Sequence, residues 1–332
     1  MMKLRHLFNN QALAQMLVKN WCYDEPSLEL FQYFRISANA IYPFRINGEV
    51  CFLRYCPTSE KKKENILAEL EFVAYLRSQQ FPALEPVPAK SGEVMVQKMT
   101  PWGEYHASVF KRVKGKEISE SGSDDKILFA YGAALGHLHR LSSEFTNPKT
   151  KRWTHVDVFN WIESELRQLD DERLALAELE LLRETFADLP IHAENYGLIH
   201  YDFEPDNVFY DEMSQACSVI DFDDAMYHWY IMDVTQALCQ LKTLAPGGEF
   251  AHKQAAFIQG YRSQFTLDQA ALALMPICRR FANLYRYTRT TRAMQEDWEN
   301  EPDWLVDLRA KLSDELVRDT EFFGRSVEDT NS

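Results

Sequence analysis

The sequence predicts an α+β fold of two lobes, a smaller one built on an antiparallel five-stranded sheet with one helix and a larger one that is mostly helical. Strand-like patterns are concentrated in the first third of the chain, and long helical patterns dominate the rest. A chain of 332 residues is also too long for a single small core. We therefore expect the smaller lobe at residues 1–113 and the larger one at residues 114–332.

A short amphipathic helix over residues 10–20, with Leu13 and Leu17 at helical spacing, is expected to lead into the smaller lobe. Three strand-like segments follow, with the sequences LELFQYFRI, NAIYPFRI and EVCFLRYC. Asn47 and Gly48 separate the last two. This dipeptide favours a type I′ turn, because both central positions of that turn need a positive φ. The pattern predicts an antiparallel hairpin.

The helix of the smaller lobe is predicted in SEKKKENILAELEFVAYLRSQ, where an apolar stripe at helical spacing runs from Ile66 to Leu76. Its lysine run, Lys61–Lys63, is expected to be a solvated start of this helix. The segment FPALEPVPAKSGEVMVQKM predicts extended chain and then a strand, and YHASVFKRVKGKEI predicts a further strand that ends at Gly115. These segments complete the predicted sheet.

The larger lobe is expected to be helical with three short strand-like insertions. The insertions have the sequences LIH, VFYD and CSVIDF. The long helical patterns cover residues 126–142, 157–187, 231–244, 250–264, 268–292 and 303–322.

Composition argues against several classes of partner. The net charge of −14 and the pI near 5.2 oppose general binding to nucleic acid, which needs clustered lysine and arginine. The six cysteines form no CxxC pair, so a zinc site is not expected. The N-terminus lacks the apolar region of a signal peptide, and no stretch approaches the roughly 20 apolar residues that span a bilayer. We expect a cytoplasmic protein without a membrane partner.

One stretch carries the polar residues of a reaction centre. His200, Asp202 and Asn207 fit the pattern H-x-D-x-x-x-x-N, and Asp221 follows in VIDFDD after a hairpin-like interval. Transfer of a phosphoryl group to a hydroxyl needs a carboxylate beside the attacking oxygen and oxygen ligands for Mg²⁺ on the phosphates. Asp202 would supply the first, and Asn207 with Asp221 the second.

The segment EPDN by itself is more typical of an ordinary turn, because Asp and Asn side chains cap local backbone. The second carboxylate, Asp221, favours the catalytic interpretation because it follows a strand at a suitable separation. Its neighbours Asp223 and Asp224 are candidates for further metal or acceptor contacts. A position in a solvated loop is expected for at least one of them.

These motifs resemble those of the aminoglycoside phosphotransferase and choline kinase superfamily, whose signature is H-G-D-x-x-x-x-N followed by I-D-[FW]. The similarity extends to the helix YGAALGHLHRL, the segment FPALEPVP and the helix YIMDVTQAL. It implies a bilobal, protein-kinase-like fold and transfer of the γ-phosphoryl group of ATP to a small-molecule hydroxyl, as in an aminoglycoside, choline, homoserine or a sugar. By this resemblance Asp202 is the catalytic base, Asn207 and Asp221 bind Mg²⁺, and Asp233 braces the catalytic loop.

The resemblance also assigns the nucleotide site, with one departure. The strand position that contacts the ATP phosphates is usually Lys, whereas CFLRYC places Arg54 there, a cation that can bind phosphate through two nitrogens. Its helix partner is expected to be Glu69, with Glu71 as the competing choice. Phe110 and Val113, near the connector between the lobes, are expected to line the nucleotide site.

The turn that covers the phosphates, in RISANAIYPF, lacks glycine, so Ser37, Asn39 and nearby backbone N–H groups would have to contact the phosphates. A second departure is Tyr201, where the family usually has Gly. We expect its ring at the edge of the acceptor pocket, between the catalytic loop and the C-terminal helices.

Two other functions compete with this one. A non-catalytic nucleotide-binding or structural protein of the same fold is favoured by Arg54 and by the turn without glycine, and is opposed by the three acidic and amide residues of the reaction centre. A protein Ser/Thr kinase is opposed by the short separation between Asp221 and the helix at 231, which leaves no room for an activation segment.

Overall fold

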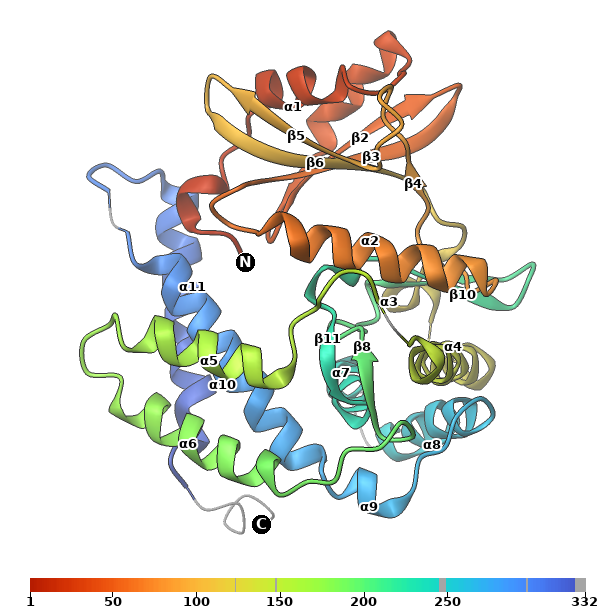
Figure 1. The fold of residues 1–332 in the computed structure, drawn as a ribbon, viewed down its shortest axis with the longest axis vertical. Coiled ribbons are helices and arrows are strands. Elements are labelled where there is room, and N and C mark those ends of the chain that lie inside the picture. Colours follow the sequence, from red (N-terminus) through yellow and green to blue (C-terminus); the bar gives the residue numbers. More distant parts are fainter. Residues whose placement is uncertain (123, 147, 245–248, 297, 326–332) are drawn as a thin grey trace.

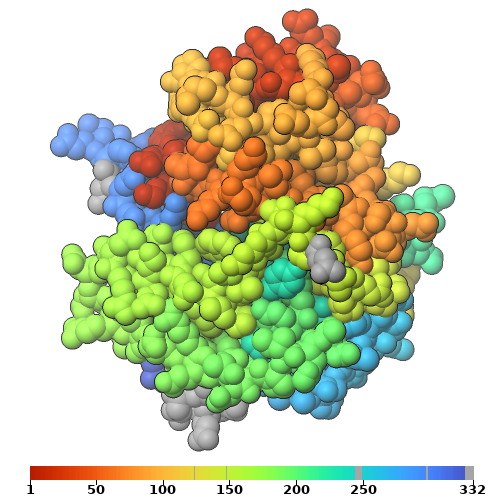
Figure 2. Space-filling view, viewed as in Figure 1, coloured from red at the N-terminus to blue at the C-terminus, as the bar shows by residue number. Residues whose placement is uncertain are grey.

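The computed structural model describes residues 1–325, apart from 123, 147, 245–248 and 297. An antiparallel sheet lies above a larger array of helices (Figure 1), which confirms the predicted α+β fold. Helix α11 lies beside the N-terminal residues, and Figure 2 shows the two in contact. Leu4 packs there against Leu305 and Leu312. No helix in the described residues is long and apolar enough to cross a membrane.

The sheet has six strands rather than five, and two of them are only two residues long. They are β1 (Arg35–Ile36), β2 (Ala40–Ile46), β3 (Glu49–Pro57), β4 (Pro86–Val87), β5 (Met95–Thr100) and β6 (Gly103–Lys111). The order is β1-β2-β3-β6-β4, and β5 pairs with β6. All pairs are antiparallel. Positive φ angles at Asn47 and Gly48, +51° and +81°, form the predicted hairpin turn between β2 and β3.

The predicted strand LELFQYFRI is wrong over most of its length. Residues Glu25–Tyr33 form a 3₁₀ helix, η2, and only Arg35–Ile36 is strand. Pro26 lies in its first turn, where a helix loses nothing by the missing N–H of proline. Phe31 is buried against Tyr42 of the sheet, with ring centroids 5.1 Å apart. The apolar side chain is therefore satisfied without strand pairing.

Two helices cover the sheet from opposite sides. Helix α1 (Gln11–Val18) packs on one face, where Leu13 and Leu17 join Tyr42, Leu53 and Val109 in one core. Helix α2 (Lys63–Ser78) lies between the other face and the helical lobe (Figure 1).

The larger lobe contains more interruptions than its sequence pattern predicts. Its helices are α3 (Ile118–Ser121), α4 (Asp125–Glu144), α5 (His155–Leu166), α6 (Arg173–Ala187), α7 (Ile231–Leu244), α8 (Phe250–Arg262), α9 (Gln269–Leu272), α10 (Met275–Met294) and α11 (Asp303–Asp319). The predicted helix 157–187 is two helices, because the chain turns at Asp171 with φ of +61°. The predicted helix 268–292 is also two helices, and Pro276 lies in the first turn of the second.

Short strands hold the loops of the larger lobe together. β9 (Val208–Asp211) and β10 (Ala216–Val219) form a hairpin, with β7 (Lys116–Glu117) on the free side of β9. β8 (Tyr196–Ile199) pairs with β11 (Met226–Trp229). The sequence predicted β8, β9 and β10 but missed β7 and β11. These pairs bring the loop 200–207 alongside residues 220–225.

Helices α4 and α8 approach each other unusually closely. A Cβ added at Gly132 would collide with the carbonyl oxygen of Phe257, and one at Gly260 would collide with that of Phe129. Neighbouring backbone cannot give way as a flexible side chain can, so these positions require glycine. This contact places α4, which also packs against β8 and β10, under the loop 200–207.

Replacement of Gly132 by Ala is expected to destabilise the protein by about 3 kcal/mol, because the overpacked contact outweighs the better helix propensity of alanine. Urea-induced unfolding followed by circular dichroism measures this loss. Arg140→Ala, on the exposed side of the same helix, is the control and should stay within roughly 0.5 kcal/mol of wild type. Equal stability of the two variants would contradict the close packing of α4 and α8.

Candidate active site

The loop that carries Asp202 is held by one buried carboxylate. Asp233, in the first turn of α7, accepts hydrogen bonds from the backbone N–H of His200 at 2.8 Å and of Tyr201 at 2.7 Å. Its Oδ2 also lies 3.1 Å from Nε2 of His139. Asp233 and His139 are fully buried. These bonds confirm that Asp233 braces the loop.

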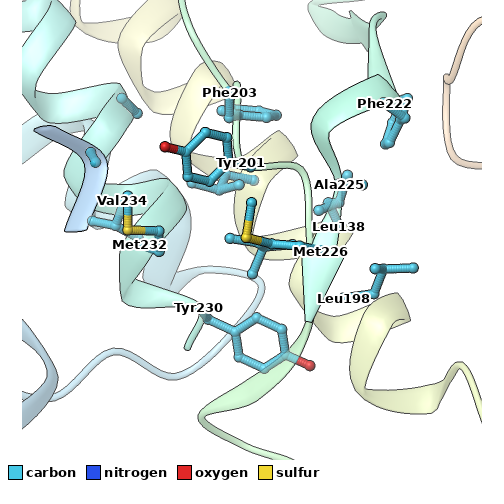
Figure 3. Packing of buried hydrophobic residues seen from close by; sticks show 14 of the residues in the cluster. Leu138, Leu198, Tyr201, Phe203, Phe222, Ala225, Met226, Tyr230, Met232 and Val234 are labelled. Atoms are coloured by element: carbon cyan, nitrogen blue, oxygen red, sulfur yellow. The ribbon is translucent and has the colours of Figure 1, made fainter. Parts of the chain in front are cut away.

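The ring of Tyr201 packs into the core beside the loop that carries Asp202. The backbone φ angle of Tyr201 is +69°, and the residue is 5% exposed. Its ring centroid lies 5.3 Å from the ring centroid of Tyr285. Figure 3 shows the ring beside Phe203 among buried apolar side chains. The expectation that this ring forms the edge of a pocket is therefore wrong. A backbone conformation that favours glycine is retained here by the Asp233 bond and by aromatic packing.

Asp202 and Asn207 lie within hydrogen-bonding distance. The Asn207 amide donates through Nδ2 to the Asp202 backbone oxygen and to Oδ2, each at 3.0 Å. Burial raises the pKa of Asp202 well above its usual range, and the carboxylates of Glu204, Asp224 and Asp221 act in the same direction. A carboxylate with a raised pKa accepts a proton more readily, as a general base must. Oδ1 of Asn207 is the amide atom left to bind a cation.

Asp221 is close to Asn207 through the backbone, because Ile220 N–H donates to the Asn207 carbonyl at 3.0 Å. Its Oδ1 is buried and has no hydrogen-bond partner among the described residues. Burial, and then the charge of Asp223, raise the pKa of Asp221 to about 6. A buried acceptor without a donor is costly, and a divalent cation would satisfy it. The oxygen atoms of Asn207 and Asp221 therefore suit a divalent cation.

Arg54 and Glu69 form a buried ion pair opposite Asp221. Arg54 on β3 donates through two nitrogens to the Glu69 carboxylate on α2, at 2.8 and 2.6 Å. The side chains are 8% and 0% exposed. The Arg54 guanidinium also lies 4.6 Å from the centroid of the Phe110 ring, and one of its nitrogens is 3.8 Å from Asp221 Oδ1.

Glu71, the competing partner, points elsewhere and accepts hydrogen bonds from the backbone N–H groups of Lys149 and Thr150 at 2.6 and 2.8 Å. The geometry therefore selects Glu69. Val113, the other predicted connector residue, is partly buried against the main core.

The turn between β1 and β2 reaches towards the acidic residues after Asp221. Ser37 N–H donates to the Asn39 carbonyl at 3.0 Å, which closes the turn. The Asn39 side chain points inward, and its Nδ2 donates to Asp223 Oδ2 at 3.2 Å. Lys61 donates to Asn39 Oδ1 at 3.0 Å and forms an ion pair with Asp223. The prediction of a solvated lysine is wrong for Lys61, whose side chain is 18% exposed.

Asp223 and Asp224 are both paired, so neither lies in a solvated loop. Arg289 on α10 donates to Asp224 at 2.7 Å. Burial acts to raise the pKa of each carboxyl, but the nearby cations together, with Lys61 the strongest for Asp223 and Arg289 the strongest for Asp224, more than offset it, and both pKa values are lowered. Sequence analysis missed Lys61 and Arg289 as members of the site, because nothing local links them to carboxylates more than 60 residues away.

A cavity of about 460 Å³ adjoins Asp223 and Asp224. Both lobes contribute to it, through the loop between β3 and α2 and through helices α5 and α10. Trp153, Trp161 and Tyr285 form aromatic parts of its wall. Glu165, on the same helix as Trp161, adds a carboxylate, and its contact with Arg292 Nε is long, at 3.9 Å.

Comparison with known proteins places the motifs in a family. A family model described as the phosphotransferase enzyme family matches residues 38–273. Over 276 residues the chain is 22% identical to the amicoumacin kinase of Bacillus subtilis (strain 168), which corresponds to 79% of this chain and 80% of that protein.

Solved structures share the fold. An amicoumacin kinase in complex with AMP-PNP, Ca²⁺ and Ami has a TM-score of 0.75 at 20% identity, covering 98% of both chains. A microcompartment-associated aminopropanol kinase has a TM-score of 0.68 at 21% identity, covering 96% of this chain and all of the other.

Removal of the Glu69 carboxylate is expected to cost roughly 3–5 kcal/mol of unfolding free energy, because Glu69→Ala leaves the Arg54 guanidinium buried without its partner. Glu71→Ala is the matched control on the same helix. It loses two hydrogen bonds at a more exposed position and should cost about 1–2 kcal/mol. Denaturant unfolding of both variants gives the comparison, and equal losses would contradict the buried pair.

Proposed function

Because the chain belongs to the phosphotransferase enzyme family and is an ATP-dependent kinase of small molecules, we propose that Asp202 is its catalytic base and that its acceptor carries a protonated amine as well as a hydroxyl. The observation that supports the first part most strongly is the convergence of three segments. The loop 200–207 carries Asp202 and Asn207, the following hairpin returns the chain at Asp221, and Arg54 faces Asp221 from the sheet.

In the proposed reaction one bond to the γ-phosphorus forms as another breaks. The acceptor hydroxyl oxygen attacks the γ-phosphorus of ATP, its proton passes to a carboxylate oxygen of Asp202, and the bond from the γ-phosphorus to the bridging oxygen breaks to release ADP. Asn207 orients Asp202 through its Nδ2. Arg54, fixed by Glu69, is placed to contact the phosphates, and Ser37 and Asn39 lie in the turn that would cover them.

The protein uses a nucleotide and a divalent metal, and we infer that Asn207 and Asp221 hold Mg²⁺. When bound, the ion neutralises charge on the phosphate oxygens. Oδ1 of Asp221 supports this assignment, because it has no hydrogen-bond donor among the described residues. It lies 3.8 Å from Arg54, the proposed phosphate contact. Phe110, beneath Arg54, and Val113 belong to the proposed nucleotide-binding side of this arrangement.

We place the acceptor in the cavity beside Asp223 and Asp224. Three cations on its wall pair with carboxylates, since Lys61 pairs with Asp223, Arg289 with Asp224, and Arg292 with Glu60 at 2.9 Å. A fourth, Arg152, donates to backbone carbonyl oxygens.

Among the described residues, the Glu165 carboxylate has only its long contact with Arg292, and it lines the same cavity as Trp153 and Trp161. Aromatic faces and a carboxylate with spare capacity favour a cationic group. The volume of about 460 Å³ suits a small amino alcohol or an amino sugar.

We predict that Asp202→Asn lowers kcat by about 10² or more while nucleotide affinity survives, because the amide keeps the shape but cannot take the proton. Asp221→Asn should instead weaken metal-dependent nucleotide binding and raise the Mg²⁺ concentration needed for activity. Titration calorimetry with ATP, with and without Mg²⁺, and an ADP-release assay separate the two effects.

Asp211→Asn, at an exposed carboxylate at the end of β9, is the matched control and should behave as wild type. Loss of metal-dependent binding in Asp202→Asn alone would reverse the two roles. Full activity in both site variants would rule out these roles for Asp202 and Asp221. A wild-type protein that binds ATP but releases no ADP would favour a non-catalytic protein.

We also predict that Glu165→Gln raises the KM of an amine-bearing acceptor by about tenfold and leaves the KM of ATP unchanged, because the variant loses roughly 1.4 kcal/mol of charge interaction. The assay compares 1-amino-2-propanol with 1,2-propanediol, which replaces the amine by a hydroxyl. Glu163→Gln, two residues earlier and paired with Arg167 and Arg183, is the control. An equal effect on both acceptors would argue against recognition of the amine by Glu165.

A further inference from the structure

Lys61 is the one member of its lysine run that turns inward, whereas Lys62 and Lys63 are exposed. Its ammonium forms an ion pair with Asp223 and donates to Asn39 Oδ1 at 3.0 Å, and the Asn39 amide donates to Asp223 Oδ2 at 3.2 Å. Three side chains from three separate loops thus form a closed network. Asn39 is 6% exposed, so the network is largely shielded from water.

Each member of the network belongs to a segment that contributes to the nucleotide site. Asn39 lies in the turn before β2, Lys61 precedes the helix that carries Glu69, and Asp223 is two residues beyond Asp221. The turn has no glycine whose backbone could wrap closely around phosphates. A side-chain link to Asp223 therefore supplies a means to hold the turn in place.

The charge of Lys61 has a second effect. Asp221 and Asp223 put two carboxylates beside a site for a triphosphate, and an uncompensated Asp223 would repel that anion. The Lys61 ammonium cancels this charge at short range. In the same loop, Glu60 pairs with Arg292 of α10 at 2.9 Å, so the loop stays attached to the helical lobe when Lys61 alone is altered.

We propose that Lys61 is a positioning residue for the nucleotide, which acts through Asn39 to hold the β1–β2 turn and through Asp223 to remove a repulsive charge beside Asp221. This proposal rests on the proposed function in that it takes ATP as the ligand. Because Lys61 also lines the cavity proposed for the acceptor, its effect on the nucleotide is measured in the absence of acceptor.

The test measures nucleotide affinity by titration calorimetry with ATP and Mg²⁺, and kcat and KM by ADP release. Lys61→Met keeps the length and removes the charge, Lys61→Arg keeps the charge, and Lys63→Met is the exposed control. We expect about tenfold weaker nucleotide binding for Lys61→Met, equal to roughly 1.4 kcal/mol. Lys61→Arg and Lys63→Met should bind the nucleotide within about threefold of wild type.

The double variant Lys61→Met/Asp223→Asn separates charge from packing. If Lys61 cancels the Asp223 charge, removal of both charges should recover at least about threefold of the lost affinity, as coupled neighbours do in double-mutant cycles. A double variant no better than Lys61→Met, or a Lys61→Met variant that binds like Lys63→Met, overturns the proposal.

Failure of the proposed kinase function would give a different result in the same assays. A wild-type protein that binds ATP but releases no ADP with any acceptor contradicts the proposed reaction, and the affinity series still decides the role of Lys61. A wild-type protein that binds no nucleotide contradicts both.

Discussion

The geometry of the site depends on the carboxylate of Asp233, which is buried beneath the loop 200–207. Asp233 is fully buried, and a buried charge is tolerated only where hydrogen bonds replace its water. It obtains them from two backbone N–H groups of the loop 200–207 and from His139, whose other nitrogen bonds Tyr261 at 2.8 Å. Helices α4, α7 and α8 are thereby tied to the loop. The position of Asp202 follows from this arrangement, because its loop has no regular structure of its own.

Ion pairs with residues of both lobes hold the acidic segment 221–224 in place. Asp221 faces Arg54 from the sheet, Asp223 pairs with Lys61 from the loop before α2, and Asp224 pairs with Arg289 from α10. Three acidic residues within four positions would repel one another without these partners. Because the partners come from both lobes, the same pairs that stabilise residues 221–224 also set how the sheet sits on the helical part.

Aromatic packing supports the loop from the side opposite the nucleotide. Tyr201 adopts a backbone conformation that costs a non-glycine residue on the order of 1–3 kcal/mol, and its ring lies in the core against Tyr285. Tyr285 in turn lines the proposed acceptor cavity. The residue that replaces the glycine of the family signature therefore acts on the acceptor side only through its neighbour.

Sequence alone determined the features that depend on local spacing. The pattern of His200, Asp202 and Asn207, the hairpin at Asn47 and the amphipathic stripe of α2 each follow from neighbours within a few residues. The tertiary structure alone decided the partners of buried charges. Glu69 and Glu71 differ by two residues and both lie on α2, yet only one reaches Arg54.

Lys61 pairs with Asp223, 162 positions away in the sequence, and Arg289 pairs with Asp224, 65 positions away. A charged side chain in a linear sequence gives no sign of which distant charge will share its low-dielectric surroundings, because that depends on how the two lobes pack.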